Sequence, residues 1–86
     1  MKIRLVGDPD DVLGFSLAGV EGFIVRDRRQ AEQALAAAET DGGIGLLLVS
    51  ATIEDLHPRA LERIRRRGGL PALIVLPAGA AHEPPP

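Results

Sequence analysis

A short buried strand followed by a helix is indicated by residues 1–20, which read MKIRLVGDPDDVLGFSLAGV. The run from Ile3 to Gly7 is mostly apolar and does not alternate, which is typical of a strand in a parallel sheet that is covered on both faces. The segment Asp8-Pro9-Asp10 then supplies an N-cap carboxylate and a proline for the first helical turn. We expect the helix to be apolar almost all round and to stop near Gly19.

Three further apolar runs follow, over residues 23–25, 44–49 and 72–76, and helical segments separate them. The second helix is expected to start at Asp27, which has capping-box spacing to Gln30, and to end at Asp41-Gly42-Gly43. The third is expected to start at a capping signal at Thr52 and to run to Arg67. Pro58 interrupts it, so one turn followed by a helix from Pro58 to Arg67 is the alternative for this segment. Their buried faces are predicted to consist of Ala31, Ala34, Leu35 and Ala38 in the second helix, and of Ile53, Leu56, Ala60, Leu61 and Ile64 in the third.

This β-α-β-α-β-α-β order predicts an α/β fold, because strand–helix–strand units close as right-handed parallel crossovers. We expect a small flavodoxin- or receiver-like three-layer domain, with a four-stranded parallel sheet in the order 2-1-3-4 and three helices. The single domain should span residues 1–77. Residues 78–86, rich in Ala, Gly and Pro, have no periodicity and are expected to form a disordered tail.

Three helices are too few to cover both faces of such a sheet. The first helix should cross to one face and the other two to the opposite face, so half of one face, over the third and fourth strands, should stay bare. The candidate residues for this interaction surface are Leu46, Leu48, Leu73 and Val75, although the sequence does not say which alternate side chains point that way. Bare apolar surface of this kind favours a partner protein or self-association.

Composition excludes several classes of protein. The chain has 86 residues and no cysteine, so disulfides, thiolate nucleophiles and cysteine-ligated metals are excluded. No apolar run approaches the roughly 20 residues needed to span a bilayer, and no signal peptide is recognisable, so we expect a cytosolic location. A net charge of −2 and the absence of Trp and Tyr argue against nucleic-acid binding.

Acidic residues at the end of the first strand, Asp8, Asp10 and Asp11, could belong to a magnesium and phosphoacceptor site like that of receiver domains. Such a site also needs an aspartate after the third strand and a lysine after the fourth, where this chain has Ser50 and Pro77. Helix capping by Asp8 or Asp10 is therefore the favoured interpretation. A phosphorylation-incompetent receiver-like signalling or protein-interaction module remains the alternative function.

No other motif predicts a cofactor, a metal or catalysis. Gly7 and Gly14 do not form a dinucleotide loop, and acids in that turn would repel a phosphate. His57 and His82 lack the spacing of a ligand pair, and a surface or capping role is favoured for them. Ser16 and Ser50 have no recognisable triad partners, although a small enzyme or ligand-binding domain stays open as a third hypothesis.

A basic cluster near the end of the third helical segment has two interpretations, and both stay open. It is either a surface for an acidic partner or a solvated helix end whose cations complement the helix dipole. The cluster consists of Arg59, Arg63, Arg65, Arg66 and Arg67.

One family shares these patterns. The matching positions in the first twenty residues are Gly7, Asp8, Gly14, Phe15, Leu17, Ala18 and Gly19. In combination with the runs at 44–49 and 70–77, they resemble the F subunit of the V-type and A-type proton- or sodium-translocating ATPases. The resemblance covers about residues 1–77, and its first motif is the most specific.

The resemblance implies a non-catalytic component of the central rotor stalk, bound to the long coiled-coil D subunit. Such a component helps to couple ATP turnover to ion transport, is cytoplasmic and peripheral, and meets the membrane only through its complex. In agreement with the residues, we expect no cofactor and no nucleic acid, and the bare face adds possible homo-oligomers of the isolated chain. Family members usually continue into a C-terminal helix, where this sequence has the Ala/Gly/Pro segment 78–86.

Overall fold

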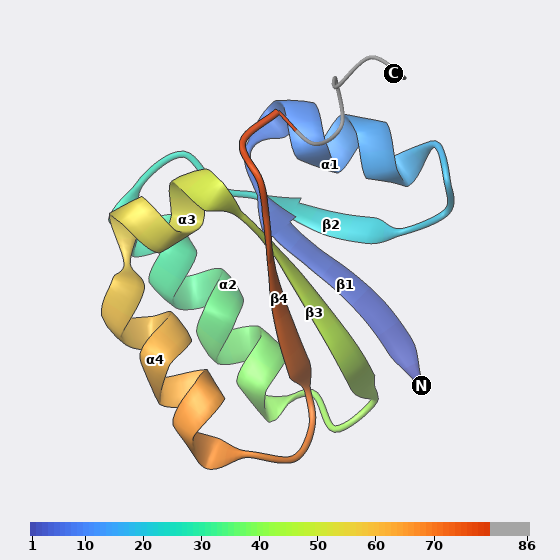
Figure 1. Ribbon diagram of the computed structural model, residues 1–86. Coiled ribbons are helices and arrows are strands. Elements are labelled where there is room, and N and C mark those ends of the chain that lie inside the picture. The colour runs from blue at the N-terminus through green and yellow to red at the C-terminus, as the bar shows by residue number, and fades with distance from the viewer. Residues whose placement is uncertain (80–86) are drawn as a thin grey trace.

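The computed structural model describes residues 1–79 and contains four parallel strands in one sheet of order β2-β1-β3-β4. This confirms the predicted fold class and strand order. The elements, shown in Figure 1, are β1 (Lys2–Gly7), α1 (Pro9–Ser16), β2 (Glu21–Ile24), α2 (Arg28–Thr40), β3 (Ile44–Ser50), α3 (Ala51–Leu56), α4 (Pro58–Arg67) and β4 (Ala72–Leu76).

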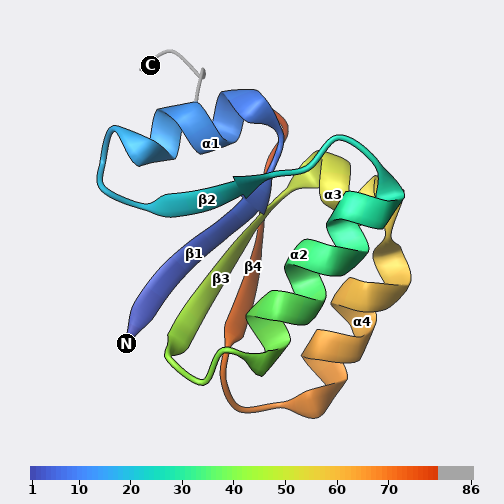
Figure 2. The same ribbon diagram turned by 180° about the vertical axis from the view of Figure 1, so that it is seen from behind.

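The helices divide unequally between the two faces of the sheet. Helices α2, α3 and α4 lie together on one face, while α1 lies on the other and packs against β1 and β2 (Figures 1 and 2). The main apolar core lies under the three-helix layer. It consists of Val6, Val25, Ala31, Leu35, Ala38, Ile44, Leu47, Val49, Ile53, Ala60, Leu61 and Ile64. The buried stripes expected for the second and third helical segments are thus confirmed, with Ala34 and Leu56 at the edge of the core.

Pro58 divides the third helical segment completely, so the described chain has four helices instead of the three expected. Proline lacks an N–H group and disfavours the α conformation of the preceding residue. Accordingly His57 has φ −149° and ψ 66°, and α4 starts at Pro58 itself. The second strand also starts earlier than expected, at Glu21, because its backbone pairs with β1 from Arg4 onward.

Two of the three expected N-caps are confirmed. The Asp8 side chain accepts a hydrogen bond from the backbone N–H of Asp11, and that of Asp27 accepts one from Gln30. The expectation for Thr52 is wrong, because α3 follows β3 directly and Ser50 occupies its N-cap position. Ser50 makes no capping hydrogen bond because its hydroxyl is engaged elsewhere.

Part of the predicted tail, residues 80–86, lies outside the described residues, as does His82. Within residues 1–79 no helix combines the length and the apolar character needed to cross a bilayer.

Candidate functional site

The turn between β1 and α1 holds the first motif positions, Gly7 and Asp8. A Cβ atom added to Gly7 would lie 2.1 Å from the Ser50 hydroxyl oxygen, so only glycine fits beside the end of β3. Asp8 follows at once and caps α1 through a 2.9 Å hydrogen bond from the Asp11 N–H group. These two residues hold β1, α1 and β3 together, so their role in this structure is structural.

The remaining motif positions form the end of α1 and the turn into β2. Gly14 and Phe15 are half-buried, whereas Leu17 and Ala18 are exposed. Gly19 has a φ of +86°, and the N–H groups of Gly19 and Val20 close the helix end on the Ser16 and Phe15 carbonyls. This is the geometry of a Schellman C-cap, which favours glycine at the residue with positive φ. The motif therefore defines a helix and its two turns, and leaves Leu17 on the surface at 85% exposure.

A buried polar cluster joins the carboxyl ends of β1 and β3. The Ser50 hydroxyl donates to an Asp11 carboxylate oxygen at 2.6 Å and accepts from the Asp8 N–H group at 3.2 Å. Ser50 is 0% exposed and Asp11 only 3%. The predicted capping role of Asp8 is confirmed, but the burial of Asp11 was not anticipated. Its position three residues after the N-cap is a sequence signal that could have suggested it.

An open cavity of about 510 Å³ lies beside this cluster, at the edge where parallel α/β sheets bind ligands. Its polar lining mixes the acids Asp8 and Asp55 with Arg26 and Thr52. Thr52 approaches Asp8 at 3.4 Å. Among residues 1–79, no group of three His, Cys, Asp or Glu side chains is placed to hold a metal ion. The Asp8–Asp11–Ser50 hydrogen bonds brace the start of α1 against the end of β3.

His57 is buried at 6% exposure, which contradicts the surface role expected for it. The alternative expectation of a capping role is met in part, because His57 occupies the C-cap position of α3 and the N-cap position of α4, although its side chain makes no capping hydrogen bond. Its Nε2 atom contacts the Glu32 carboxylate of α2, and its Nδ1 atom is buried without a hydrogen-bond partner. The hydrogen bond from His57 is the main reason that the pKa of Glu32 lies below its ordinary value of 4.5. The His57 side chain thus links the α3–α4 junction to α2. Local sequence patterns do not predict this contact, because the two residues are 25 positions apart.

The face of the sheet beside α1 is only half covered. Helix α1 lies over β1 and β2, whereas no helix of residues 1–79 lies over β3 and β4 on this face (Figures 1 and 2). Register pairing forms two rows, Ile3 with Leu46 and Ala72, and Leu48 with Ile74. Ile3 and Ile74 are 45% and 49% exposed. We call this surface the uncovered half-face; it consists of Ile3, Leu46, Leu48, Ala72, Ile74 and Leu76.

Two of the four residues predicted for this surface belong to the opposite face. Leu73 and Val75 pack against the core under the three-helix layer, so their assignment to the bare surface is wrong. Leu46 and Leu48 are on the expected side, with Leu48 nearly buried. Side chains alternate along a strand, and an apolar run without polar positions does not show which alternate set is covered. Ile3 and Ile74 were missed for the same reason.

Comparisons with known proteins agree with this architecture. Residues 3–84 match the family model described as ATP synthase (F/14-kDa) subunit. The F subunit of a V-type ATP synthase from Thermus thermophilus is 33% identical over 72 residues, which cover 84% of this chain and 69% of that protein. The F subunit of the A-type ATP synthase of Methanothermobacter thermautotrophicus is 34% identical over 77 residues, covering 88% of this chain and 72% of that protein.

A solved structure shows the same fold. The crystal structure of the V-type ATP synthase F subunit from Archaeoglobus fulgidus superposes with a TM-score of 0.73 at 22% sequence identity. The match covers 87% of this chain and 95% of that one. The likeness in fold therefore extends over most of both chains.

Proposed function

Because the chain belongs to the ATP synthase (F/14-kDa) subunit family, we propose that it is a central-stalk component of a V/A-type ion-translocating ATPase that binds the coiled-coil D subunit. As a member of that family it is an accessory, non-catalytic subunit of a rotary ATPase. The proposal extends to the contact itself, which we assign to the uncovered half-face.

The observation that carries this proposal is the size and character of that surface. Neighbouring strands lie about 4.8 Å apart, so β3 and β4 together are about as wide as one α-helix, about 10 Å. The exposed side chains of this surface are aliphatic, and Ile74 of β4 and Ile3 of the adjoining strand β1 are nearly half exposed. One partner helix placed beside α1 would complete the layer and remove these side chains from water. A coiled coil supplies a long, straight helix of this kind.

In this proposal the chain contributes rigid packing to the rotor. ATP turnover and ion transport stay with other subunits, and the stalk links the two processes mechanically. The location is then cytoplasmic and peripheral to the membrane, through the complex alone. The Ser50–Asp11 brace and the His57–Glu32 contact support such a role, because both fasten elements that are distant in sequence.

The experiment is co-purification with the coiled-coil stalk subunit encoded by the same genome. The wild-type chain should elute with that protein as one complex. The Ile74→Asp variant should weaken the complex by about a hundredfold, because docking would bury an unpaired carboxylate.

The matched control is Ala36→Asp, which introduces the same charge at an exposed position of α2. It should bind the stalk subunit as the wild-type chain does, and both variants should keep the circular dichroism of the folded protein. If wild type and Ile74→Asp bind equally, the assignment of the contact fails. If the wild-type chain does not bind at all, the proposed function fails.

A further inference from the structure

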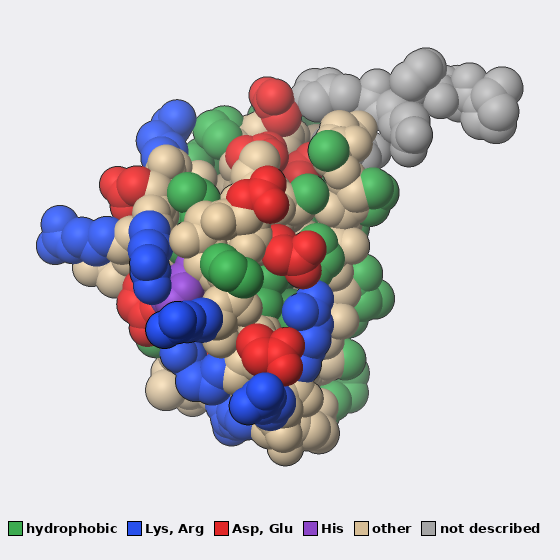
Figure 3. Space-filling view, turned by 60° about the vertical axis from the view of Figure 1, so that its left-hand side comes forward, with side chains coloured by type: hydrophobic (Ala, Val, Ile, Leu, Met, Phe, Trp, Pro, Cys, Tyr) green, Lys and Arg blue, Asp and Glu red, His purple; other side chains and the backbone are tan. Residues whose placement is uncertain are grey.

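Helix α4 carries a concentrated positive charge on the side of the molecule away from the uncovered half-face. Residues 58–67 hold five arginines and one glutamate, a net charge of +4 in a chain whose total is −2. Lys and Arg side chains gather over this helical layer, while hydrophobic ones line the right-hand edge of the view (Figure 3). The apolar side of the helix, Ala60, Leu61 and Ile64, is buried in the core, so the arginines occupy its outer side.

Part of this charge is balanced within the molecule. Arg63 binds Glu39 of α2 at 2.6 Å, and Arg67 approaches the same carboxylate at 3.5 Å. Arg65 pairs with Glu54 of α3 at 3.1 Å. These contacts attach α4 to its neighbours and account for three of the five arginines.

The other two arginines form no hydrogen bond or ion pair with another element within residues 1–79. No hydrogen bond or ion pair reaches the Arg59 guanidinium within residues 1–79. Among the described residues, Arg66 forms an ion pair only with Glu62, one turn earlier on its own helix, and its side chain remains 79% exposed. Cations near a helix C-terminus are favoured by the helix dipole, which suits Arg65, Arg66 and Arg67. Arg59 lies in the first turn, where the helix dipole disfavours a cation. The dipole therefore does not account for Arg59, and its side chain is available to a partner molecule.

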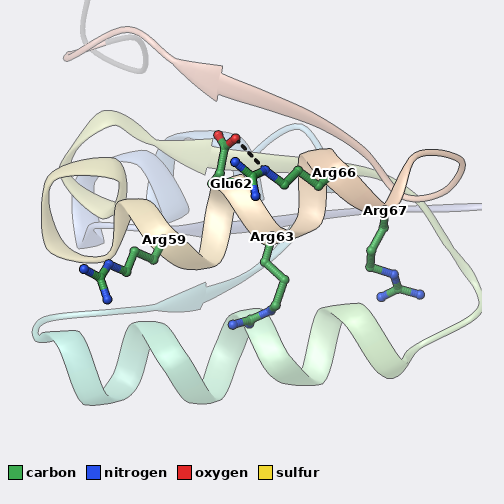
Figure 4. A pocket seen from close by; sticks show the side chains of 5 residues that line it. All are labelled: Arg59, Glu62, Arg63, Arg66 and Arg67. Carbon is green, nitrogen blue, oxygen red and sulfur yellow. Dashed lines mark hydrogen bonds and ion pairs between the residues drawn. The ribbon is translucent and has the colours of Figure 1, made fainter.

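The arrangement of these side chains is regular (Figure 4). Arg59, Arg63 and Arg67 are spaced four residues apart and extend on the side of α4 that faces α2, while Glu62 and Arg66 form a parallel row on the other side. All five line a shallow cavity of about 550 Å³ on the outer surface of the helix. Rows of residues four apart form the ridges and grooves into which a second helix packs.

We propose that this groove is a docking surface for an acidic α-helix of a partner protein. Guanidinium groups bind carboxylates through paired hydrogen bonds. Arg59, and Arg66 with its single exposed ion pair to Glu62, stand at opposite ends and sides of the groove. A helix with carboxylates four residues apart presents one ridge of matching spacing. The surface lies in the three-helix layer, so it is separate from the proposed stalk contact and does not rest on it.

A protein partner is favoured over a nucleic acid or a membrane by the mixed charge of the surface. Glu62 stands within the groove at 54% side-chain exposure, and Glu32 lies next to Arg63 at its border. A dense row of phosphates would meet these carboxylates as repulsions. A protein helix can accommodate them, because it can place neutral or basic side chains opposite.

The test uses the full chain and two fluorescent alanine-based helical peptides of identical composition. One carries glutamates at every fourth position along a single side, and the other carries them on all sides. The first peptide should bind about fivefold tighter, since it alone can align carboxylates with Arg59 and Arg66 together. Equal binding of the two peptides would overturn the proposal, because it would reflect only general attraction of anions.

Variants locate the binding. Arg59→Glu should weaken binding of the first peptide about fivefold, and Arg66→Glu should do the same. Arg26→Glu is the matched control, since Arg26 lines the separate cavity at the end of the sheet, and it should change binding less than about twofold. Arg59 has no described internal partner, so its variant should fold, as circular dichroism will verify. Tighter binding to duplex DNA or to phosphatidylserine vesicles than to the first peptide, at equal ionic strength, would also overturn the proposal.

Discussion

Gly7 ends β1 beside Ser50, the last residue of β3. A methyl group there would come within 2.1 Å of the Ser50 oxygen and 3.2 Å of its Cβ atom. Ser50 is fully buried and holds Asp11, so it cannot move aside freely. We expect Gly7→Ala to lower the free energy of unfolding by about 1–3 kcal/mol, measured by urea denaturation.

The control for this change is Gly42→Ala, because no heavy atom lies within 4 Å of a Cβ atom at Gly42. Its effect should stay within about 0.5 kcal/mol. The Gly7→Ala change should also cost less in a Ser50→Ala background, where the clashing oxygen is gone. Simple additivity of the two changes would show that the close contact is not the cause.

Glu32 gives the protein a pH-dependent contribution to stability. The hydrogen bond from His57 holds the pKa of this carboxyl below its ordinary value of 4.5. The unfolded chain therefore takes up the proton at a higher pH than the folded chain. The stabilising contribution is present above the ordinary pKa and is lost as the pH falls through the lower, folded-state pKa.

We accordingly expect the urea midpoint to decline on acidification below about pH 5, and Glu32→Gln to flatten that decline. Asp41 contributes in the same direction, because its hydrogen bonds from the Lys2 side chain and the Gly43 N–H group lower its pKa. An unchanged slope in Glu32→Gln would show that its contact with His57 does not persist in solution.

At the scale of elements, the connection from α1 to β2 depends on the left-handed conformation of Gly19. Its φ of +86° lets the chain reverse directly after the helix, and no neighbouring atom lies within 4 Å of a Cβ atom there. Any cost of Gly19→Ala therefore comes from the backbone, at about 1–2 kcal/mol. Thermal unfolding can measure it, and a cost as small as that of Gly42→Ala would exclude this conformation.

Element identity and order were predictable from the sequence because their signals are local. Asp8 and Asp27 cap helices three residues upstream of the N–H groups they bind, and Pro58 marks its own helix start. The prediction of an N-cap at Thr52 was wrong because Ser50 occupies the N-cap position of α3, and the Ser50 hydroxyl already donates a hydrogen bond to Asp11. A capping motif in the sequence does not fix the start of a helix when the preceding strand runs directly into it, as β3 does here.

The site was less predictable because its determinants are distant in sequence. The Ser50–Asp11 and His57–Glu32 contacts join residues 39 and 25 positions apart. The uncovered half-face was expected, but its residues were divided wrongly between the two faces. A register irregularity between Lys2 and Ile3 also places Ile44 in the core and Leu46 on the other side. Alternation counted along β3 without that irregularity would put both on one face.

At the scale of the whole molecule, the uncovered half-face should make the isolated chain self-associate. Two copies can shield Ile3 and Ile74 from water by placing these faces together. Sedimentation velocity should show an average mass that rises with concentration, and Ile74→Asp should suppress the rise. A wild-type chain that stays monomeric at all concentrations would contradict this expectation.

The two chemically distinct surfaces lie on different layers of the molecule. The aliphatic one is the proposed contact with the stalk, and the arginine groove on α4 is the proposed contact with an acidic helix. An adaptor that joins a rotor to a second protein requires such a separation, because both contacts must form at once. Peptide binding to α4 should therefore be unchanged when the stalk subunit is bound.

The most direct measurement exploits the absence of cysteine from the sequence. A single thiol introduced by Ile74→Cys should react readily with a maleimide in the free chain and become strongly protected when the coiled-coil stalk subunit is added. A thiol introduced by Ala36→Cys, on the exposed side of α2, should react equally in both states. Protection at position 74 with none at position 36 is the predicted result, and equal labelling of Ile74→Cys with and without a bound stalk subunit would contradict docking through this face.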